Sequence, residues 1–419
     1  MDITILGAGS RGVNAYGRIL HHMPGVRIGA ICDINEEKRL HAKETFNLIN
    51  ENIYTNEDEF FSNGVIGDAL IIASMDHDHF RHTTKAISAG YKKILLEKPV
   101  SQDINETQEI ARLAKENNVD ILVCHVLRYS KFYKTIRDVI RSGQIGNVMT
   151  IHHQENIAHW HFAHSFTRGN WRNTAESAPL IFAKTCHDFD LLYWFADSKF
   201  TDIESYGALS YFNQENAPEG CSKRCLDNCK YYDTCAFSVK KAYIDWDTPL
   251  NWGFFHATGK NNPTTEEKIT SLKNPNNPYG RCVYYCDNDL CDHQSAVMQF
   301  ESGATATLTV TAFTKDNYRK IHITGTKGEL YGSDQDSYIS VNIFGKKPSR
   351  GLFRRRSNRI SIRSGIGGHH GGDSGICDTF VKLIRGDEID ADYLTTIDVT
   401  LVSHNILSIA EEKRQAKLK

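Results

Sequence analysis

Two side chains in this sequence are well suited to hold developing charge and to move a proton. Lys98 follows the apolar run 94–96 and precedes a proline that stops regular continuation of the chain, so we expect it at the end of a strand. Its ammonium can hydrogen-bond a reacting oxygen and stabilise negative charge there. His187 lies in a stretch with helical spacing, and its imidazole titrates near neutrality, as a proton relay requires. The alternatives are an exposed lysine at a strand end and a buried histidine paired with Asp190.

The first apolar run of the chain, from Ile3 to Leu6, leads into a glycine-rich loop. Gly7 allows a tight turn out of the strand, Gly9 lets a pyrophosphate approach the backbone, and Gly12 lets the next helix pack on the strand. That helix, expected over about 13–23, would direct its free N–H groups at the phosphates. The loop therefore predicts a dinucleotide site, and a plain tight turn is the alternative.

An acidic residue closes the second apolar run. Asp33 follows the strand expected over 26–32, close to the roughly 20-residue spacing at which a carboxylate grips the adenosine ribose. A carboxylate there would repel a 2′-phosphate, so Asp33 favours NAD over NADP, although Arg11 lies near enough to soften that repulsion. The alternative is that Asp33 only caps the following helix.

The order of apolar runs indicates how these residues are positioned. The chain has 419 residues, which suits two domains. In the first part, short apolar runs alternate with amphipathic stretches, which predicts a doubly wound parallel sheet of Rossmann type. The runs lie near 3–6, 26–32, 69–73, 94–96 and 120–124.

The second part has a different pattern. Polar and apolar residues alternate over 295–313, with a turn at Ser302-Gly303, which predicts a large, mostly antiparallel sheet in an α+β domain. We therefore expect an α/β protein with a dinucleotide-binding domain over residues 1–125. A substrate-binding and oligomerisation domain would span 126–419, with a cysteine-rich insertion at about 212–292 and two helices within about 374–414.

The composition excludes several classes of partner. The net charge is −2 and no apolar run is long enough to span a bilayer, so neither nucleic acid nor a membrane is favoured. The chain starts in a strand without a secretion-signal pattern, and we expect a cytoplasmic location. The basic run within 354–363 is expected to be a solvated hairpin or a partner contact, because no nucleic-acid motif accompanies it. An anionic sugar is the alternative ligand of that run.

Seven of the 11 cysteines lie between residues 221 and 291. The gaps between Cys221, Cys225, Cys229 and Cys235 are three, three and five residues, which is near the spacing of structural zinc sites. Cys225, Cys229 and Cys235, completed by either Cys221 or Cys282, are therefore a candidate zinc site that would staple the insertion. The alternatives are an iron–sulfur cluster, free thiols in a reduced cytoplasm, or disulfides formed after purification.

Four motifs together resemble those of the glucose–fructose oxidoreductase/inositol dehydrogenase/MocA family. They are the loop from Gly7 to Gly12, the segment from Ser74 to His79, Glu97-Lys98-Pro99, and His187-Asp188-Phe189-Asp190. The resemblance implies a Rossmann domain, an α/β domain with a large sheet, NAD(P), a carbohydrate substrate and a homodimer or homotetramer. The cofactor-binding residues expected from the loop and the resemblance are Gly7, Gly9, Ser10, Arg11, Gly12, Asp33, Ser74, His77, His79, Glu97 and Lys98.

The sequence departs from the family pattern just before His187. The family commonly has an aspartate four residues before the histidine and a glycine two before it, where this chain has Ala183 and Thr185. Lys184 is the nearest ionisable substitute. The expected catalytic residues are therefore Lys98, His187 and Lys184, and which group holds the proton stays open.

Further residues are expected to line a substrate pocket. An arginine–tyrosine pair follows the last Rossmann strand, where the family often has a polar and an aromatic residue. The stretch 161–172 mixes aromatic residues with hydrogen-bond donors, and the glycine–histidine run at 368–373 is similar to runs in carbohydrate-acting relatives. A loop packed under the sheet and a flexible loop with a capping aspartate are the alternatives. The candidates are Arg128, Tyr129, His164, Arg168, Trp171, Asp190, His369 and His370.

These expectations lead first to an NAD(P)-dependent oxidoreductase that transfers a hydride between nicotinamide and a hydroxyl of a sugar, polyol or sugar derivative. NAD is expected rather than NADP, with a structural zinc as a second cofactor. One alternative is a redox-neutral glycosidase or isomerase that oxidises its sugar transiently. The other is a non-catalytic cofactor-binding sensor, which the altered residues Ala183 and Thr185 would suit.

Overall fold

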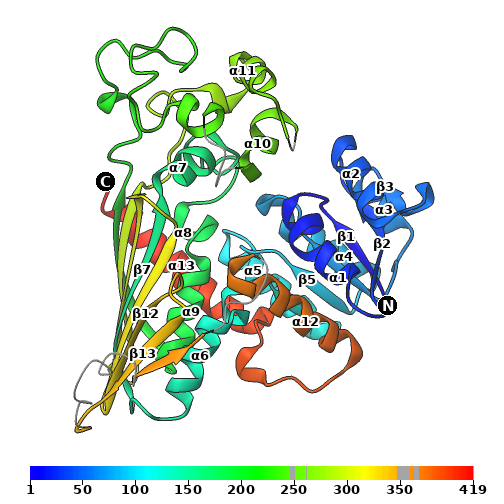
Figure 1. Cartoon of the computed structure of the whole chain (residues 1–419). Helices are drawn as coiled ribbons and strands as arrows, with labels where there is room; N and C mark the ends of the chain where they lie inside the picture. The colour runs from blue at the N-terminus through cyan, green and yellow to red at the C-terminus, as the bar shows by residue number, and fades with distance from the viewer. Residues whose placement is uncertain (246–250, 261, 347–357, 363–367, 419) are drawn as a thin grey trace.

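Two β-sheets organise the computed structural model, which describes residues 1–245, 251–260, 262–346, 358–362 and 368–418 (Figure 1). The first sheet has six parallel strands, and the second has eight strands that are mostly antiparallel. This confirms the predicted fold class, a Rossmann-type sheet followed by an α+β part with a large sheet.

The first sheet has the strand order β3-β2-β1-β4-β5-β6. Its inner strands are buried along their length, because helices cover both faces of the parallel sheet. The order reverses between β1 and β4, so a crevice is expected there at the carboxyl ends of the strands. The strands are β1 (Asp2–Leu6), β2 (Arg27–Cys32), β3 (Ile53–Tyr54), β4 (Ala69–Ile72), β5 (Lys93–Leu96) and β6 (Asp120–Val123).

Three helices of this part begin after residues whose side chains cap them, namely Asn35, Asn56 and Asp103. Asp103, for example, accepts a hydrogen bond from the Asn105 N–H at the start of α5. The helix after the glycine loop starts with π-type hydrogen bonding. The helices are η1 (Ser10–Gly17), α1 (Arg18–His21), α2 (Glu36–Phe46), α3 (Glu57–Ser62), α4 (His79–Ala89) and α5 (Ile104–Glu116).

The second sheet has the order β14-β13-β12-β11-β7-β10-β9-β8, and β7 pairs in parallel with β10. Exposed and buried residues alternate along β9, so one face packs on helices and the other is open. The strands are β7 (Val148–Ala158), β8 (Phe200–Ala208), β9 (His293–Phe300), β10 (Thr305–Thr314), β11 (Tyr318–Gly325), β12 (Gly328–Ser333), β13 (Tyr338–Ile343) and β14 (Arg359–Ser361).

Helices lie between the second sheet and the Rossmann part (Figure 1). The helix α9 packs on β7 and β10, and α13 packs on β8 as well as on α5 of the first part. The helix α12 returns to the glycine loop and packs beside η1. The helices are α6 (Lys131–Arg141), α7 (His159–Phe162), η5 (Ala163–Arg168), α8 (Leu180–Ala183), α9 (Cys186–Ala196), α12 (Gly372–Arg385) and α13 (Ile397–Ala416).

The segment between β8 and β9 forms a small module at one end of the second sheet, at the top of Figure 1. It has short helices and its own small core around Val239, Tyr243 and Leu272. Its longer helices are α10 (Asn251–Thr258) and α11 (Thr265–Lys273). Because the module has little regular secondary structure and only a small core, we expect its stability to depend on further contacts between its loops.

Most of the basic run lies outside the described residues, namely Arg354, Arg355, Arg356 and Arg363. Arg359 lies in β14, where its guanidinium stacks 3.8 Å from the centre of the Tyr338 ring. Throughout the described ranges, every helix is too short or too polar to cross a membrane.

Candidate active site

The glycine loop packs closely against the backbone at Gly7 and Gly12 and is open at Gly9. Gly7 has a φ of +99°, and a Cβ there would lie 2.5 Å from the backbone of Ala73 and Ser74. A Cβ on Gly12 would lie 2.1 Å from the Gly7 carbonyl oxygen, whereas one on Gly9 would meet no described heavy atom within 4 Å. The loop therefore fits a dinucleotide, whose pyrophosphate would approach at Gly9 and meet the helix that begins at Ser10.

Asp33 braces this loop from the end of β2. Its carboxylate accepts hydrogen bonds from the Ala8 N–H and the Asn35 N–H, both at 2.8 Å. The helix cap of α2 is Asn35, so Asp33 is not the capping residue itself. Arg39 donates to the Asp33 carbonyl oxygen at 2.8 Å, which places a guanidinium near the expected ribose position. Arg39 was not singled out from the sequence, since a basic residue within a charged helix carries no distinctive signal.

The segment after β4 is tied to the neighbouring strand ends. His79 lies between two carbonyl oxygens, that of Pro99 at 2.7 Å and that of Ser74 at 3.2 Å. The Ser74 hydroxyl lies 2.8 Å from His82 Nδ1, and the half-exposed His77 pairs with a neighbouring aspartate. Ser74 and His79 thus shape the edge of the crevice, and cofactor contact by these residues stays a prediction.

Arg11 joins the Rossmann part to α12. Its guanidinium contacts Glu97 at 2.7 Å and Asp373 at 3.0 Å. Burial opposes ionisation of both carboxyls, but the nearby cations prevail and hold the pKa of Glu97 below its usual range and that of Asp373 at about 2. Glu97 also accepts the backbone N–H of Lys98 at 2.9 Å. Arg11 and Glu97 therefore fix the turn that carries Lys98.

Lys98 lies at the carboxyl end of β5 and reaches the second part of the chain. Its Nζ donates to the carbonyl oxygen of Ala183 at 2.8 Å. Ala183 is the last residue of α8 and occupies the position where the family has an aspartate. A backbone oxygen therefore holds the lysine here, and it leaves the ammonium with further protons to donate.

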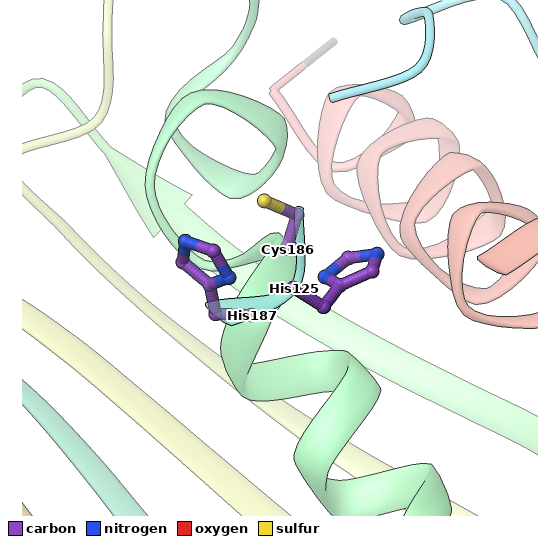
Figure 2. A group of neighbouring side chains, drawn as sticks. All are labelled: His125, Cys186 and His187. Atoms are coloured by element: carbon purple, nitrogen blue, oxygen red, sulfur yellow. The ribbon is translucent and has the colours of Figure 1, made fainter. Parts of the chain in front are cut away.

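His187 faces this lysine from the first turn of α9. Figure 2 shows His187 and His125 flanking Cys186, and the ligand atoms of the three lie within 4.8 Å of one another. The rings of His187 and His369 are 6.1 Å apart. Burial, followed by the positive charge of Lys98, holds the pKa of His187 well below its usual range. Its Nδ1 has no hydrogen-bond partner in the part of the chain that the structure describes, so a neutral imidazole is left to accept a proton.

Two imidazoles and a thiol are also potential metal ligands. Burial is the main reason that the pKa values of His125 and His187 are lowered, and the ammonium of Lys98, which also acts on Cys186, lowers both further. A cation at this place would be repelled by that ammonium. The arrangement therefore suits proton handling better than metal binding.

Lys184 is held by a buried acid that sequence reasoning missed. Its Nζ lies 3.1 Å from Glu155 on β7, and Arg319 contacts the same carboxylate at 2.8 Å. Arg319 also pairs with Asp188 at 2.7 Å, and Asp188 accepts from His153. Strand alternation could have placed Glu155 on the inner face of the sheet but could not have named its partners. Lys184 thus belongs to a charge network beside His187.

Three of the expected substrate residues are used within the protein. Arg128 and Asp190 form a buried bidentate pair, with distances of 2.6 and 2.8 Å. The Tyr129 hydroxyl bonds to Thr395 at 2.8 Å. His369 lies nearer the catalytic residues, with its ring centre 6.1 Å from that of His187, and it contacts Asp373 at 3.1 Å, whereas His370 lies 3.9 Å from Asp334. Substrate contact by all of these residues stays a prediction, best supported by position for His369.

The three candidates from the stretch 161–172 lie toward the cysteine-rich module. His164 Nδ1 is 2.8 Å from the Tyr243 hydroxyl. Arg168 donates to the carbonyl oxygens of Arg281 and Phe237, each at 2.7 Å. Trp171 packs near Phe166, with ring centres 6.5 Å apart. The structure does not bring these residues together with Lys98 and His187.

The structure does not support the expected zinc site. Within the described ranges, the cluster at His187 is the only group of three or more potential ligands whose atoms lie within 4.8 Å of one another. Tetrahedral thiolate zinc would set its sulfurs about 3.8 Å apart. Spacing along the sequence does not fix such separations. The predicted zinc ligands that are not brought this close together are Cys225, Cys229 and Cys235, with either Cys221 or Cys282 as the fourth.

Comparisons with known proteins agree with the fold and the loop. Residues 1–125 match the model of an oxidoreductase family with an NAD-binding Rossmann fold, and residues 137–394 match the model of its C-terminal alpha/beta domain. The oxidoreductase YteT of Bacillus subtilis is 23% identical over 312 residues, which cover 73% of this chain and 70% of that protein. An inositol 2-dehydrogenase of Corynebacterium glutamicum is 26% identical over 211 residues, which cover 49% of this chain and 56% of the relative.

Solved structures share the whole architecture. The WlbA dehydrogenase from Bordetella pertussis, in complex with NADH and UDP-GlcNAcA, has a TM-score of 0.66 at 16% identity, covering 100% of this chain and 96% of that one. An oxidoreductase from Agrobacterium radiobacter, in complex with NAD+, L-tartaric acid and magnesium, has a TM-score of 0.65 at 14% identity, covering 100% and 97%. The chain belongs to the glucose–fructose oxidoreductase/inositol dehydrogenase/MocA family of NAD-binding oxidoreductases.

Proposed function

We propose that this chain is an NAD-dependent dehydrogenase that oxidises a hydroxyl of a sugar, polyol or sugar derivative. One observation carries the proposal. The ammonium of Lys98, at the end of its strand, is held by the carbonyl oxygen of Ala183, which lies four residues before His187 in the chain. His187 is a buried, neutral imidazole, and the glycine loop beside these residues is open for a dinucleotide. Oxidation of an alcohol needs a group to hold the oxygen and a base for its proton, and these two residues supply both.

The cofactor would be held by the glycine loop and Asp33. When bound, nicotinamide supplies the hydride acceptor for the alcohol carbon. The carboxylate of Asp33 would accept the ribose hydroxyls and disfavour a 2′-phosphate. Arg39 donates to the Asp33 carbonyl oxygen near the same place, where an arginine could accommodate a 2′-phosphate, so the preference rests on the Asp33 carboxylate, and we propose NAD as the preferred cofactor.

In the proposed mechanism, Lys98 donates a hydrogen bond to the reacting oxygen while the Ala183 carbonyl keeps its Nζ in place. His187 accepts the hydroxyl proton at a ring nitrogen. Lys184 and Arg319 together neutralise the buried Glu155 carboxylate, and Glu155 in turn offsets their positive charge beside the imidazolium. The third catalytic candidate thus acts in this proposal by balancing charge.

The substrate class is proposed from the family and from the polar groups around the site. Among the relatives, one is named for inositol and one structure holds a nucleotide sugar acid. In this chain, His369 borders His187 and offers a donor and an acceptor for neighbouring hydroxyls, and His370 follows it in the same turn.

The test is a panel of sugars, polyols and sugar acids assayed for reduced nicotinamide by absorbance, with co-purified cofactor identified by mass spectrometry. Net NADH formation is expected. Product formed without NADH would favour transient oxidation of the sugar, and complete lack of turnover would favour a sensor.

We also propose that the open face of the second sheet forms a homodimer or homotetramer contact. Val297, Tyr206 and Tyr331 expose 52%, 61% and 45% of their surface on strands of this sheet. A cavity of about 620 Å³ lies on the same sheet, lined among others by His152, Thr309 and His322. Such an apolar, unpaired face is typical of an interface between copies.

A further inference from the structure

The cysteine-rich module encloses a cavity of about 290 Å³. Five thiols line it, while its described lining includes no carboxylate, imidazole, lysine or arginine. The rest of the wall is largely aromatic, including Tyr211 and Tyr284, whose hydroxyls are 2.8 Å apart. Sulfur is therefore the strong ligand that this cavity offers. The thiols are Cys221, Cys225, Cys229, Cys235 and Cys282.

Backbone contacts bring these cysteines together from distant segments. Residues 224 and 281 form an antiparallel bridge, and the Cys282 N–H donates to the Lys223 carbonyl oxygen at 2.9 Å. Cys225 and Cys282 thereby lie on adjacent segments that this isolated bridge joins, and each is only 7% exposed. A tight turn returns Cys235 to the same cavity, with its N–H bonded to the Tyr231 carbonyl oxygen.

A buried cation faces these thiols. Arg168 is 1% exposed, and its Nη2 lies 4.0 Å from the Cys225 sulfur. Its Nη1 has no hydrogen-bond partner, and none of the described carboxylates forms an ion pair with the guanidinium. A buried guanidinium without a counter-ion is costly. Thiolates bound to a metal would supply the missing negative charge.

The backbone also presents a donor to sulfur. The Phe237 N–H points to the Cys235 sulfur at 3.4 Å, a contact of the kind that stabilises metal-bound thiolates. The small core of the module is too limited to hold several loops by itself. A metal centre would join the segments that carry Cys225, Cys235 and Cys282.

The separation of the thiols argues against a single zinc and favours a larger centre. No three of them fall within 4.8 Å of one another, whereas a single zinc would draw its four sulfurs to about 3.8 Å. In an iron–sulfur cubane each thiolate binds a different iron, so the sulfurs stand farther apart. A cavity of about 290 Å³ also has room for several atoms.

We propose that Cys225, Cys229, Cys235 and Cys282 hold a four-iron iron–sulfur cluster that staples the module, with the Arg168 guanidinium as its buried counter-charge. Cys282 completes the set because it is buried and fixed by the strand bridge. Cys221 is left out because its thiol is hydrogen-bonded to the Tyr285 hydroxyl. Binding releases the four thiol protons and ties the module to the second sheet.

The test measures iron, acid-labile sulfide and zinc in the full chain, expressed with added iron and purified without oxygen. The expected content is about four irons and about four sulfides per chain, with broad visible absorbance. One zinc without iron, about two irons, or a metal-free protein whose thiols all react with a thiol reagent would each overturn the proposal.

Variants then test the ligand set in the same preparation. Cys225→Ser and Cys282→Ser should each lower iron content about tenfold or more. Cys221→Ser, and Cys291→Ala outside the cavity, should retain the wild-type content. Loss of iron in Cys221→Ser, or full retention in Cys282→Ser, would contradict the assignment. The metal content of the unaltered chain decides the central point even if a variant fails to fold.

Discussion

Replacing Lys98 with methionine removes the ammonium while keeping most of the side chain's volume. The amine is held at 2.8 Å from the Ala183 carbonyl oxygen and would donate to the reacting oxygen. Loss of one such preorganised donor costs about 3–4 kcal/mol in the transition state, so kcat should fall about 10²–10³-fold. NAD affinity should be unchanged, because the glycine loop and Asp33 are intact. The assay is NADH absorbance for turnover and calorimetry for binding.

The same substitution has a second consequence at His187. Burial and the Lys98 charge both lower the pKa of that imidazole, so removing the charge should raise it. The acid limb of the residual activity, or the ring titration by NMR, should then move to higher pH. Lys93→Met, on the same strand, is the matched control and should change neither quantity. A Lys98→Met enzyme with kcat near the wild-type value, or one that fails only because it no longer binds NAD, would refute the reasoning.

Three further outcomes are expected. Asp33→Ala should weaken NAD binding by about 1.5–3 kcal/mol, measured by calorimetry, and reduce the preference over NADP; unchanged affinity would contradict its ribose role. Buried His125, His187 and His404 have lowered pKa values, chiefly because of burial, so below about pH 6.5 the unfolded chain binds more protons and stability falls. Each should cost up to about 1 kcal/mol of unfolding free energy between pH 6.5 and 5.5, because an unfolded histidine is already half protonated at pH 6.5, and a flat denaturation profile there would count against neutral histidines. Val297→Arg should lower the solution mass by light scattering; an unchanged oligomer would place the interface elsewhere.

The Rossmann part of the fold could be predicted because its turn and its strands each require particular residue types. Gly7 and Gly12 both lie where a Cβ would strike backbone, and the buried strands read as apolar runs. The alternation around β9 likewise predicted one open face. The central place of β7 could not be predicted, since its parallel pairing with β10 joins segments far apart in the chain.

The sequence predicted which residues of the candidate site lie at a strand end or at the start of a helix, but not which side chains they contact. Lys98 and His187 follow from local motifs, whereas the contacts of Lys184 with Glu155 depend on how α8 meets the sheet. The hydrogen-bond donors and aromatic residues around Arg168 could equally line a sugar pocket or pack against the cysteine-rich module, so the sequence could not decide between the two. Cysteine spacing similarly left the separation of the sulfurs undefined.

The most direct measurement is a crystal structure of the chain with NAD bound. The pyrophosphate is expected at Gly9, with the reactive nicotinamide carbon facing a space bordered by Lys98 Nζ and the His187 ring. A nicotinamide ring directed away from both side chains, or a dinucleotide bound elsewhere on the molecule, would contradict the proposed chemistry.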